Sequence, residues 1–415
     1  MSKYVIEGGN RLRGSVRVAG SKNAVLPLLA ATLLTDKDCE ISNVPDIHDV
    51  RSFLEILQSL GARADFEKGI VKINCGLVNS FLPDPKVTKT MRASVVLMGA
   101  LLGRFGKAEV ALPGGDKIGK RPIDFHIRAF QSLGADVAEG ELIKLKAKKL
   151  TGAELYAESS VTGTENMILA SVLAHGQTKI KLAALEPHVQ QLCEFLNLMG
   201  ATISGIGSHT ISIKGVRTLK GAKTRVIPDM LEAGTFAILA AASHSSLEIK
   251  DVRHDHLDAV YDKFKRIGVS FDKTKESLII NKPRNAYLAT EIKTGVYPSL
   301  ATDLQPPFGV MATQCSGVTK IHDWIYEGRL GYLQELSKMG AKVKKIDEHK
   351  AEVFGATKLR GAKIDSLDIR SGITLVIAAL IAKGKSEISG VEHIDRGYEK
   401  LEEKISAIGG SIKRI

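Results

Sequence analysis

The chain has 415 residues, of which 44% are hydrophobic and 25% are charged. These proportions are typical of a folded protein of two or three domains, and they exclude a disordered, collagen-like or disulfide-framework chain. Four cysteines without a C-x-x-C pair argue against a zinc knuckle and indicate a reducing compartment. We expect neither a secretory signal nor a membrane span, because the N-terminus has no apolar segment and the longest apolar stretches reach only about ten residues.

The formal net charge of +12 indicates an anionic partner. Nucleic acid, a membrane surface and phosphorylated metabolites all fit a charge of this sign. Aromatic residues make up only 5% of the chain, and no stretch mixes Lys and Arg with Tyr and Phe as a base-stacking surface does. This composition disfavours nucleic acid without excluding it.

In chain order, the sequence first predicts strands over residues 4–9 and 14–20. A helix follows over residues 23–34, and its apolar residues on all sides predict that it is buried. After a polar turn and a further strand, residues 47–60 have the apolar spacing of an amphipathic surface helix. Residues 64–75 then alternate around a central Gly and predict a hairpin.

This order of elements recurs six times along the chain. Each surface helix ends in a hydrophobic-Gly-small signature, whose Gly is expected to terminate the helix in a left-handed conformation. The signatures lie about 70 residues apart, and their glycines are Gly61, Gly134, Gly200, Gly268, Gly340 and Gly409. The buried helices are expected to start near Ser21, Thr90, Thr162, Asp229, Thr302 and Ser371. A near-constant period of this kind indicates six repeated helix-strand units.

Three units of this length make a domain of ordinary size. We therefore predict an α/β fold of two domains with three units each. Residues 21–228 form the first domain, and residues 1–20 and 229–415 form the second, which the N-terminal strand completes. Because each domain is expected to close its own core, we expect a monomer.

Polar and charged residues recur where the buried helices begin, namely Lys22-Asn23, Arg92, Thr164, Asp229, Asp303 and Arg370. Helix N-termini attract anions, so six of them facing one interdomain cleft predict an anion site. Capping is the alternative for the hydroxyl and carboxylate residues. The Lys and Arg side chains have the wrong charge for an N-terminus, and they favour the site.

Residues 113–122 (PGGDKIGKRP) combine glycines, prolines and cations with Asp116. The segment is either a solvated surface loop or a mobile lid that carries a reactive carboxylate over a cleft. It is not a phosphate-binding loop, because the G-x-x-x-x-G-K-[ST] pattern is absent.

Seven motifs resemble those of the UDP-N-acetylglucosamine 1-carboxyvinyltransferases, the MurA family of enolpyruvyl transferases. They occupy, in family order, residues 20–31, 113–127, 225–235, 297–305, 326–329, 368–370 and 393–399. The resemblance covers the whole chain. It implies two inverted α/β domains, each with three repeated units, which is the fold type that enolpyruvyl transferases share with RNA 3′-terminal phosphate cyclases.

The resemblance also implies a reaction. The enolpyruvyl group of phosphoenolpyruvate passes to the 3-hydroxyl of UDP-N-acetylglucosamine through a tetrahedral intermediate, and phosphate leaves. No metal or organic cofactor, nucleic acid or membrane takes part. The step commits material to peptidoglycan, and hence to cell-wall growth and division, in the bacterial cytoplasm. Both substrates are polyanions, which agrees with the positive charge.

By resemblance, Lys22, Arg121 and Arg396 contact the phosphate of phosphoenolpyruvate, and Arg370 lies nearby. Asn23 touches the sugar, and Asp303 is the base for its hydroxyl. The residues expected to hold the nucleotide are Arg92, Arg121, Pro122, Ile123, Asp124, Phe125, Val161, Thr162, Gly163 and Ile325.

The main departure from the family pattern is Asp116, which stands where most members have a lid Cys. We expect Asp116 to be the catalytic acid, its pKa raised when the lid excludes water. Because a carboxylate opens an epoxide poorly, we also expect resistance to fosfomycin, which alkylates the family's Cys. Pro306-Pro307 and Gly328 depart from the pattern as well, beside Asp303 and the nucleotide residues respectively.

Three alternatives remain at this point. The first is 5-enolpyruvylshikimate-3-phosphate synthase, although the apolar run after Lys22 differs from the polar run typical of that enzyme. The second is an RNA-binding or RNA-end-processing protein that uses the basic cleft. The third is a non-catalytic homologue that binds the nucleotide without turnover, since the lid Cys is missing.

Overall fold

The computed structural model describes residues 2–112, 114–115, 118–119 and 121–415. These residues form two compact units. Unit N comprises residues 20–115 and 121–227, and unit C comprises residues 2–19, 118–119 and 228–415. The predicted fold class is confirmed: each unit is an α/β domain built from three helix-strand repeats. Ile118 and Gly119 belong to unit C, whereas the sequence assigned the whole segment 113–122 to the first domain.

Unit N contains three repeats, the second of which opens with a 3-10 turn. Its elements are α1 (Lys22–Thr32), β3 (Cys39–Ser42), α2 (His48–Ser59), β4 (Arg63–Glu67), β5 (Ile70–Asn74), α3 (Pro85–Thr88), η1 (Arg92–Val96), α4 (Leu97–Phe105), β6 (Lys107–Ala111), α5 (Asp124–Ser132), β7 (Asp136–Ala138), β8 (Leu142–Lys146), β9 (Glu154–Tyr156), α6 (Val161–Ser171), β10 (Gln177–Lys181), α7 (Pro187–Leu198), β11 (Thr202–Ser204), β12 (Thr210–Lys214) and β13 (Lys223–Arg225).

Unit C begins with the two N-terminal strands and continues after residue 228. Its elements are β1 (Lys3–Gly8), β2 (Arg13–Arg17), α8 (Met230–Ala242), β14 (Ser246–Lys250), η2 (His254–His256), α9 (Asp258–Ile267), β15 (Phe271–Lys273), β16 (Ser277–Ile280), β17 (Glu291–Lys293), η3 (Thr302–Leu304), α10 (Gln305–Ala312), β18 (Gly317–His322), η4 (Arg329–Gly331), α11 (Tyr332–Lys338), β19 (Lys342–Lys345), β20 (Lys350–Gly355), β21 (Lys363–Asp365), α12 (Ile369–Ile381), β22 (Gly384–Ser389), α13 (Glu392–Asp395), α14 (Leu401–Ala407) and β23 (Ser411–Arg414).

Each repeat contributes one small sheet. The strand orders in unit N are β13-β3-β5-β4, β6-β8-β7 and β11-β12-β10-β9, and those in unit C are β15-β16-β14-β2, β17-β18-β20-β19 and β21-β22-β1-β23. Each four-stranded sheet contains one parallel pair, for example β9 with β10, which α6 connects. Of these parallel edge strands, β2 overlaps the strand predicted at residues 14–20, whereas β9, β13, β17 and β21 were not predicted. Most have only three residues, which is too short for a visible alternation.

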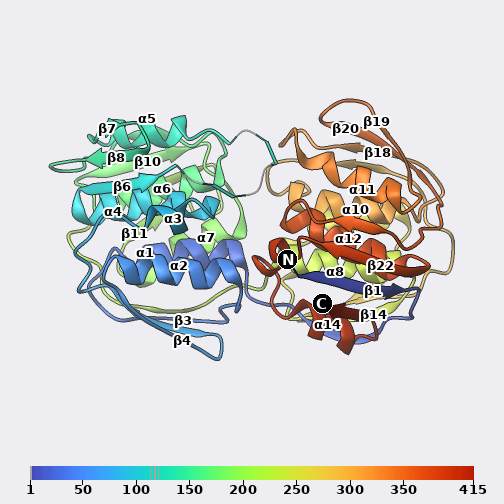
Figure 1. Cartoon of the computed structure of the whole chain (residues 1–415). Coiled ribbons are helices and arrows are strands. Elements are labelled where there is room, and N and C mark those ends of the chain that lie inside the picture. Colours follow the sequence, from blue (N-terminus) through green and yellow to red (C-terminus); the bar gives the residue numbers. More distant parts are fainter. Residues whose placement is uncertain (1, 113, 116–117, 120) are drawn as a thin grey trace. The chain divides into compact units, whose positions relative to one another are not determined.

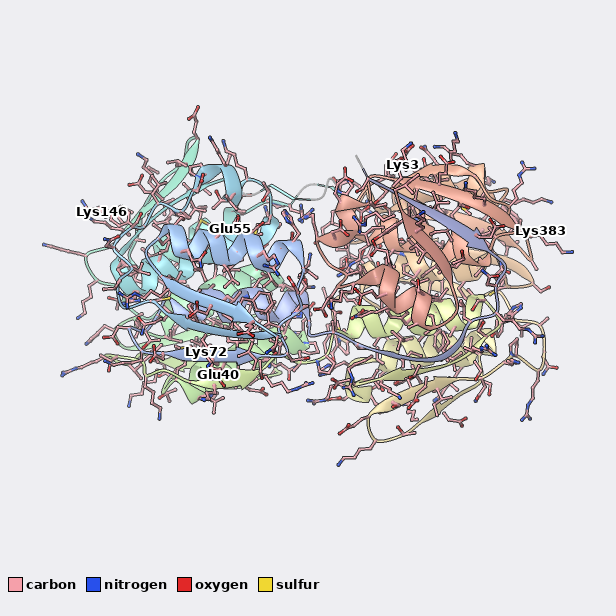
Figure 2. All side chains as sticks on the ribbon, turned by 60° about the horizontal axis from the view of Figure 1, so that its bottom comes forward. Lys3, Glu40, Glu55, Lys72, Lys146 and Lys383 are labelled. Atoms are coloured by element: carbon pink, nitrogen blue, oxygen red, sulfur yellow. The ribbon has the colours of Figure 1, made fainter. Side chains whose placement is uncertain are left out.

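The buried helices form the centre of each unit, and the sheets lie toward its periphery (Figure 1). In β5 and β10, for example, exposed and buried residues alternate, so one face of each sheet packs inward. Two separate clusters of buried side chains result, one in each unit. The outward faces carry much of the charge: Lys72 and Lys146 project from strands into solvent (Figure 2).

The six predicted helix-ending glycines all adopt a left-handed conformation, with φ from 90° to 106°. In each case the N–H of the following residue donates to the carbonyl five positions earlier, as from Ala62 to Leu57 and from Val269 to Phe264. This is the Schellman arrangement, which satisfies carbonyls that the end of the helix leaves open. One local signal therefore sets the same turn six times.

The N-terminal strand β1 lies between β22 and β23, and it is antiparallel to both. The first strand of the chain thus completes the last sheet of unit C. Within the described part of the chain, every helix is too short or too polar to cross a membrane.

Candidate functional site

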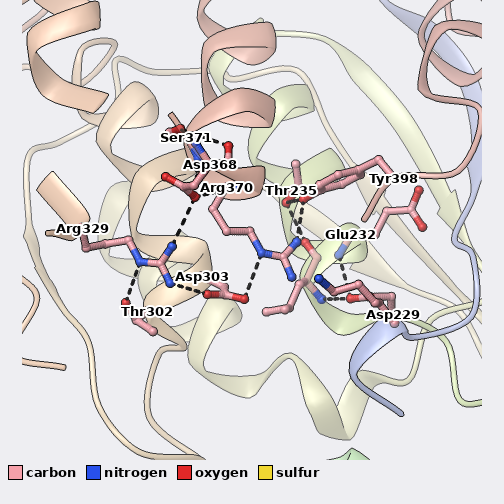
Figure 3. Close-up of polar contacts among 12 residues, drawn as sticks. Asp229, Glu232, Thr235, Thr302, Asp303, Arg329, Asp368, Arg370, Ser371 and Tyr398 are labelled. Atoms are coloured by element: carbon pink, nitrogen blue, oxygen red, sulfur yellow. Dashed lines mark hydrogen bonds and ion pairs between the residues drawn. The ribbon is translucent and has the colours of Figure 1, made fainter. Parts of the chain in front are cut away.

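In unit C, the carboxylate of Asp303 lies between two guanidinium groups (Figure 3). Its Oδ2 accepts from Arg370 Nε at 2.9 Å, and its Oδ1 accepts from Arg329 Nη2 at 2.7 Å. Asp303 comes from η3, Arg370 from the first turn of α12 and Arg329 from the start of η4. Three segments far apart in sequence therefore hold one carboxylate.

The two arginine side chains are almost inaccessible, whereas Asp303 retains 24% of its side-chain exposure. Burial opposes a charged guanidinium, but Asp303, Tyr398 and Asp229 together outweigh this effect and raise the pKa of Arg370 above its usual value. Arg370 is therefore a fixed cation. The carboxylate is the member of this group that a ligand can reach.

Tyr398 and Asp368 hold Arg370 from its other sides. Arg370 Nη1 donates to Tyr398 Oη at 3.2 Å, and that hydroxyl lies 3.2 Å from Thr235 Oγ1 on α8. Asp368 caps α12 by accepting from the backbone N–H of Arg370 at 2.8 Å, and it lies 3.6 Å from Arg329 Nη1. The cluster thus connects the starts of η3, η4 and α12 to the first turns of α8.

Two other predicted residues of unit C lie close to this cluster in sequence. Arg396 follows α13 directly, is half-buried and precedes Tyr398 by two residues. Ile325 is half-buried in the loop after β18. Its backbone N–H donates to Asp323 Oδ1 at 3.2 Å.

The capping alternative has different outcomes at the three candidate positions. It is correct for Asp229, whose Oδ1 accepts from the N–H of Leu231 at 2.7 Å. It is wrong for Thr164, because Ser160 caps α6, and for Asp303, which lies inside η3 and is the N-cap residue of neither η3 nor α10. Pro306 lies in the first turn of α10, where proline is tolerated, so Asp303 precedes that helix in η3.

In unit N, Lys22 and Asn23 are the first two residues of α1, and both are half-buried. Lys22 Nζ forms an ion pair of 3.2 Å with Asp49 on α2. The two side chains retain 12% and 4% of their exposure. Asp49 therefore holds the lysine charge at the start of the first buried helix.

The predicted nucleotide residues of unit N come from three neighbouring segments. Arg92 begins η1, and its Nη2 donates to the carbonyl of Pro122 at 3.3 Å. Phe125 lies in the first turn of α5 against Gly163 in the first turn of α6: a Cβ atom at Gly163 would be 2.6 Å from the Phe125 ring. Gly163 thus permits the two helix starts to approach closely. The other residues in these segments are Arg121, Ile123, Asp124, Val161 and Thr162.

His126 connects two of these segments through a buried network. Asn166 Oδ1 accepts from the N–H of Gly99 at 2.7 Å, so its amide nitrogen faces both the Val95 carbonyl and His126 Nδ1, each at 2.9 Å. His126 Nδ1 is therefore the acceptor, and Nε2 carries the ring proton. Nε2 lies 3.5 Å from Thr162 Oγ1, within the nucleotide segment.

This network predicts a pH dependence of stability. Burial, and secondarily Arg92, lower the pKa of His126 from 6.5 to about 3. The folded state therefore keeps the ring neutral while the unfolded chain takes up a proton below pH 6.5, so this contribution to stability is lost as the pH falls. We expect the loss to approach about 1.4 kcal/mol per pH unit below pH 6.

Urea unfolding at pH 7.0, 6.0 and 5.0 measures this effect. His126→Gln should lower the slope by about 1.4 kcal/mol per pH unit below pH 6, while the exposed His209→Gln should leave it unchanged. Equal slopes for wild type and His126→Gln would show that His126 does not cause the pH dependence.

Asp116, the expected lid acid, lies outside the described residues. Two neighbouring residues, Ile118 and Gly119, pack against residues 327–328 within unit C. The N–H of Gly328 donates to the Ile118 carbonyl at 3.0 Å, and a Cβ atom at Gly328 would be 2.8 Å from the Ile118 carbonyl carbon. The small residue at Gly328 therefore allows this backbone contact.

Several residues of the Asp303 cluster and of the His126 network had no role in the sequence prediction, although they lie within the quoted motifs. Arg329 ends the motif at residues 326–329, Tyr398 lies in that at 393–399, and His126 lies in that at 113–127. Their contacts connect residues more than 25 positions apart, so no local periodicity signals them.

A comparison with family models matches residues 6–405 to EPSP synthase (3-phosphoshikimate 1-carboxyvinyltransferase). Among individual proteins, UDP-N-acetylglucosamine 1-carboxyvinyltransferase 1 of Caldanaerobacter subterraneus subsp. tengcongensis is 41% identical, over 100% of this chain and 99% of the relative. The UDP-N-acetylglucosamine 1-carboxyvinyltransferase of Methylacidiphilum infernorum is also 41% identical, with the same coverage of both chains.

Solved structures with the same fold are enolpyruvyl transferases. NikO from Streptomyces tendae superposes with a TM-score of 0.91 at 22% identity, over 100% of this chain and 99% of its own. The EPSP synthase from Acinetobacter baumannii superposes with a TM-score of 0.78 at 18% identity, over the full length of both chains. At these low sequence identities, the similarity shows a shared fold and no more.

Proposed function

The chain belongs to the EPSP synthase family of 1-carboxyvinyltransferases, and on that premise we propose that it transfers the enolpyruvyl group of phosphoenolpyruvate to the 3-hydroxyl of UDP-N-acetylglucosamine. The observation that carries the choice of acceptor is the 41% identity, over the whole chain, to relatives that bear this name. The EPSP synthase structures share only 17–18% of their residues with the chain.

In this proposal, Asp303 takes the proton of the acceptor hydroxyl. Its two oxygens each accept one guanidinium hydrogen bond, and a carboxylate oxygen can accept more than one such bond. The 24% exposure of its side chain supports access for that hydroxyl, and the fixed positions of Arg329 and Arg370 hold the carboxylate in one orientation.

The phosphate of phosphoenolpyruvate is assigned to Lys22, Arg121 and Arg396. Guanidinium groups suit bidentate contacts to phosphate oxygens, and a lysine adds a compact charge. The ion pair of Lys22 with Asp49 supports this role, because it holds the ammonium group half-buried at a helix start. The nucleotide is assigned to the Arg92, 121–125 and 161–163 segments together with Ile325.

The reaction then proceeds in two balanced steps. In the addition, the acceptor oxygen bonds to C2 of phosphoenolpyruvate, its proton passes to Asp303, and Asp116 donates a proton to the methylene carbon. In the elimination, the Asp116 carboxylate takes a proton back from that carbon, the double bond reforms, and the bond from C2 to the phosphate oxygen breaks. The proton held by Asp303 passes to the departing phosphate, so both carboxyl groups return to their starting states. The acid requires a pKa raised toward neutrality, which a closed, dry site provides.

The setting follows from the substrates. We place the reaction in the cytoplasm, where both phosphorylated metabolites occur, as the step that commits UDP-N-acetylglucosamine to peptidoglycan. The separate buried core of each unit supports a monomer.

A phosphate-release assay with purified protein tests this proposal. With phosphoenolpyruvate present, UDP-N-acetylglucosamine should elicit steady phosphate release, and shikimate 3-phosphate should not. Release with shikimate 3-phosphate alone would instead identify an EPSP synthase. Steep salt-dependent binding of an oligonucleotide, without phosphate release, would favour the RNA-binding alternative.

A further inference from the structure

Asp323 is a buried carboxylate next to the Asp303 cluster. It follows β18 and has no exposed surface. Its Oδ1 accepts from the backbone N–H groups of Ile325 and Tyr326 at 3.2 and 3.4 Å, and its Oδ2 accepts from Thr302 Oγ1 at 2.6 Å. The two oxygens of one side chain therefore contact two separate parts of the site.

The hydroxyl of Thr302 transmits this contact to Arg329. Thr302 Oγ1 also accepts from Arg329 Nε at 3.2 Å. A hydroxyl has one hydrogen, and a carboxylate can only accept, so the hydrogen points to Asp323 and a lone pair faces Arg329. Arg329 in turn donates to Asp303 at 2.7 Å. The order of contacts is Asp323, Thr302, Arg329 and Asp303.

The backbone around Asp323 is held equally closely. Its N–H donates to the carbonyl of His349 at 2.8 Å, and His349 Nδ1 donates to the Asp323 carbonyl at 2.6 Å. The neighbouring Trp324 is 48% exposed, but its indole N–H donates to the Thr294 carbonyl at 2.6 Å. These contacts fix the backbone of Asp323, and a residue that positions other side chains requires such a fixed backbone.

We propose that Asp323 is a positioning residue that acts through Thr302 and Arg329 to hold Asp303 in its productive orientation, and at the same time fixes the loop of Ile325. This inference rests on the proposed function, in which Asp303 serves the acceptor hydroxyl and Ile325 the nucleotide. The side chain of Asp323 would thus connect the residue that serves the acceptor hydroxyl with the loop that contacts the nucleotide.

Asp323→Asn separates the two contacts. The Asn oxygen can still accept from the N–H groups of Ile325 and Tyr326, which leaves its NH₂ group facing Thr302. An NH₂ group donates, so the hydroxyl of Thr302 must rotate to present a lone pair to it, and this rotation disturbs the hydrogen bond from Arg329. We expect kcat to fall about 10- to 100-fold while KM for UDP-N-acetylglucosamine stays within about threefold. Asp323→Ala removes both contacts and should also raise that KM.

Thr302 supplies matching variants. Thr302→Val should reproduce the loss of kcat, and Thr302→Ser, which keeps the hydroxyl, should restore at least half of the wild-type kcat. The double variant Asp323→Asn/Thr302→Val should lose no more activity than either single variant, because both interrupt one chain of contacts. Asp262→Asn is the control, since its exposed carboxylate pairs with Arg266 on α9, outside this chain of contacts.

Steady-state kinetics and the crystal structure of Asp323→Asn together decide the inference. The crystal structure should show Arg329 Nε turned away from Thr302 and the Asp303 carboxylate displaced. An unmoved Arg329–Asp303 pair would overturn the inference whether or not the wild type is active. So would a wild-type kcat in Asp323→Asn, or a kcat loss equally large in Asp262→Asn. A further outcome is a wild type that releases no phosphate with either UDP-N-acetylglucosamine or shikimate 3-phosphate, while Arg329 is displaced in Asp323→Asn. That result would overturn the proposed function but support the positioning role of Asp323.

Discussion

Replacing Asp303 with Asn should lower kcat about 1,000-fold, because an amide cannot take the proton of the acceptor hydroxyl. The same change leaves Arg329 and Arg370 buried without their shared carboxylate. Uncompensated buried charges of this kind typically cost about 3–5 kcal/mol, so a lower urea midpoint should accompany the loss of activity. Steady-state phosphate release at saturating substrates, with urea unfolding of the same preparation, measures both effects.

Two further variants distinguish chemistry from stability. Asp303→Glu keeps a carboxylate near the two guanidinium groups, and it should retain more activity than the amide variant. Asp395→Asn removes a carboxylate that pairs with Arg414 elsewhere in unit C, and it should leave kcat unchanged. A folded Asp303→Asn enzyme with near-normal kcat would exclude Asp303 as the base.

Changes at Asp116 should have the second large effect. Asp116→Ala is expected to reduce kcat about 100-fold or more, because the methylene carbon then lacks a proton donor. Wild type should form no covalent adduct with fosfomycin. All four cysteines are buried, and burial raises the pKa of each thiol, to about 11 for Cys75 and about 12 for Cys193 and Cys315, which keeps them unreactive.

Asp116→Cys provides the counterpart to this variant. It should keep activity, since a thiol also donates a proton, and should gain one fosfomycin adduct per chain in intact-protein mass spectrometry. A stoichiometric adduct on wild type would refute the resistance prediction. Full activity of Asp116→Ala would exclude Asp116 as the acid.

The repeated architecture was predictable because its signals are local. Each helix-ending glycine and each apolar helix can be recognised within about 15 residues of sequence. The capping role of Asp229 is also a local signal, since its side chain accepts hydrogen bonds from the nearby Leu231 and Glu232. The three-residue edge strands were not predictable, because a strand such as β13 pairs with β3, which lies more than 180 residues earlier.

Only some members of the candidate site were predictable, and their contacts were not. The motifs named Asp303 and Arg370 separately, but their direct pairing spans 67 residues. Arg329, Thr302 and Asp323 join them through contacts of 21 to 27 residues in separation, and such contacts depend on how η3, η4 and β18 pack. The structure therefore adds the connections between residues that sequence motifs identify one at a time.

The most direct test of the central claim is mass spectrometry of the nucleotide after incubation of wild-type protein with phosphoenolpyruvate and UDP-N-acetylglucosamine. We predict a nucleotide that is heavier by one enolpyruvyl group, formed in equal amount to the released phosphate. An unchanged nucleotide, together with enolpyruvyl transfer to shikimate 3-phosphate in a parallel reaction, would contradict the proposed acceptor.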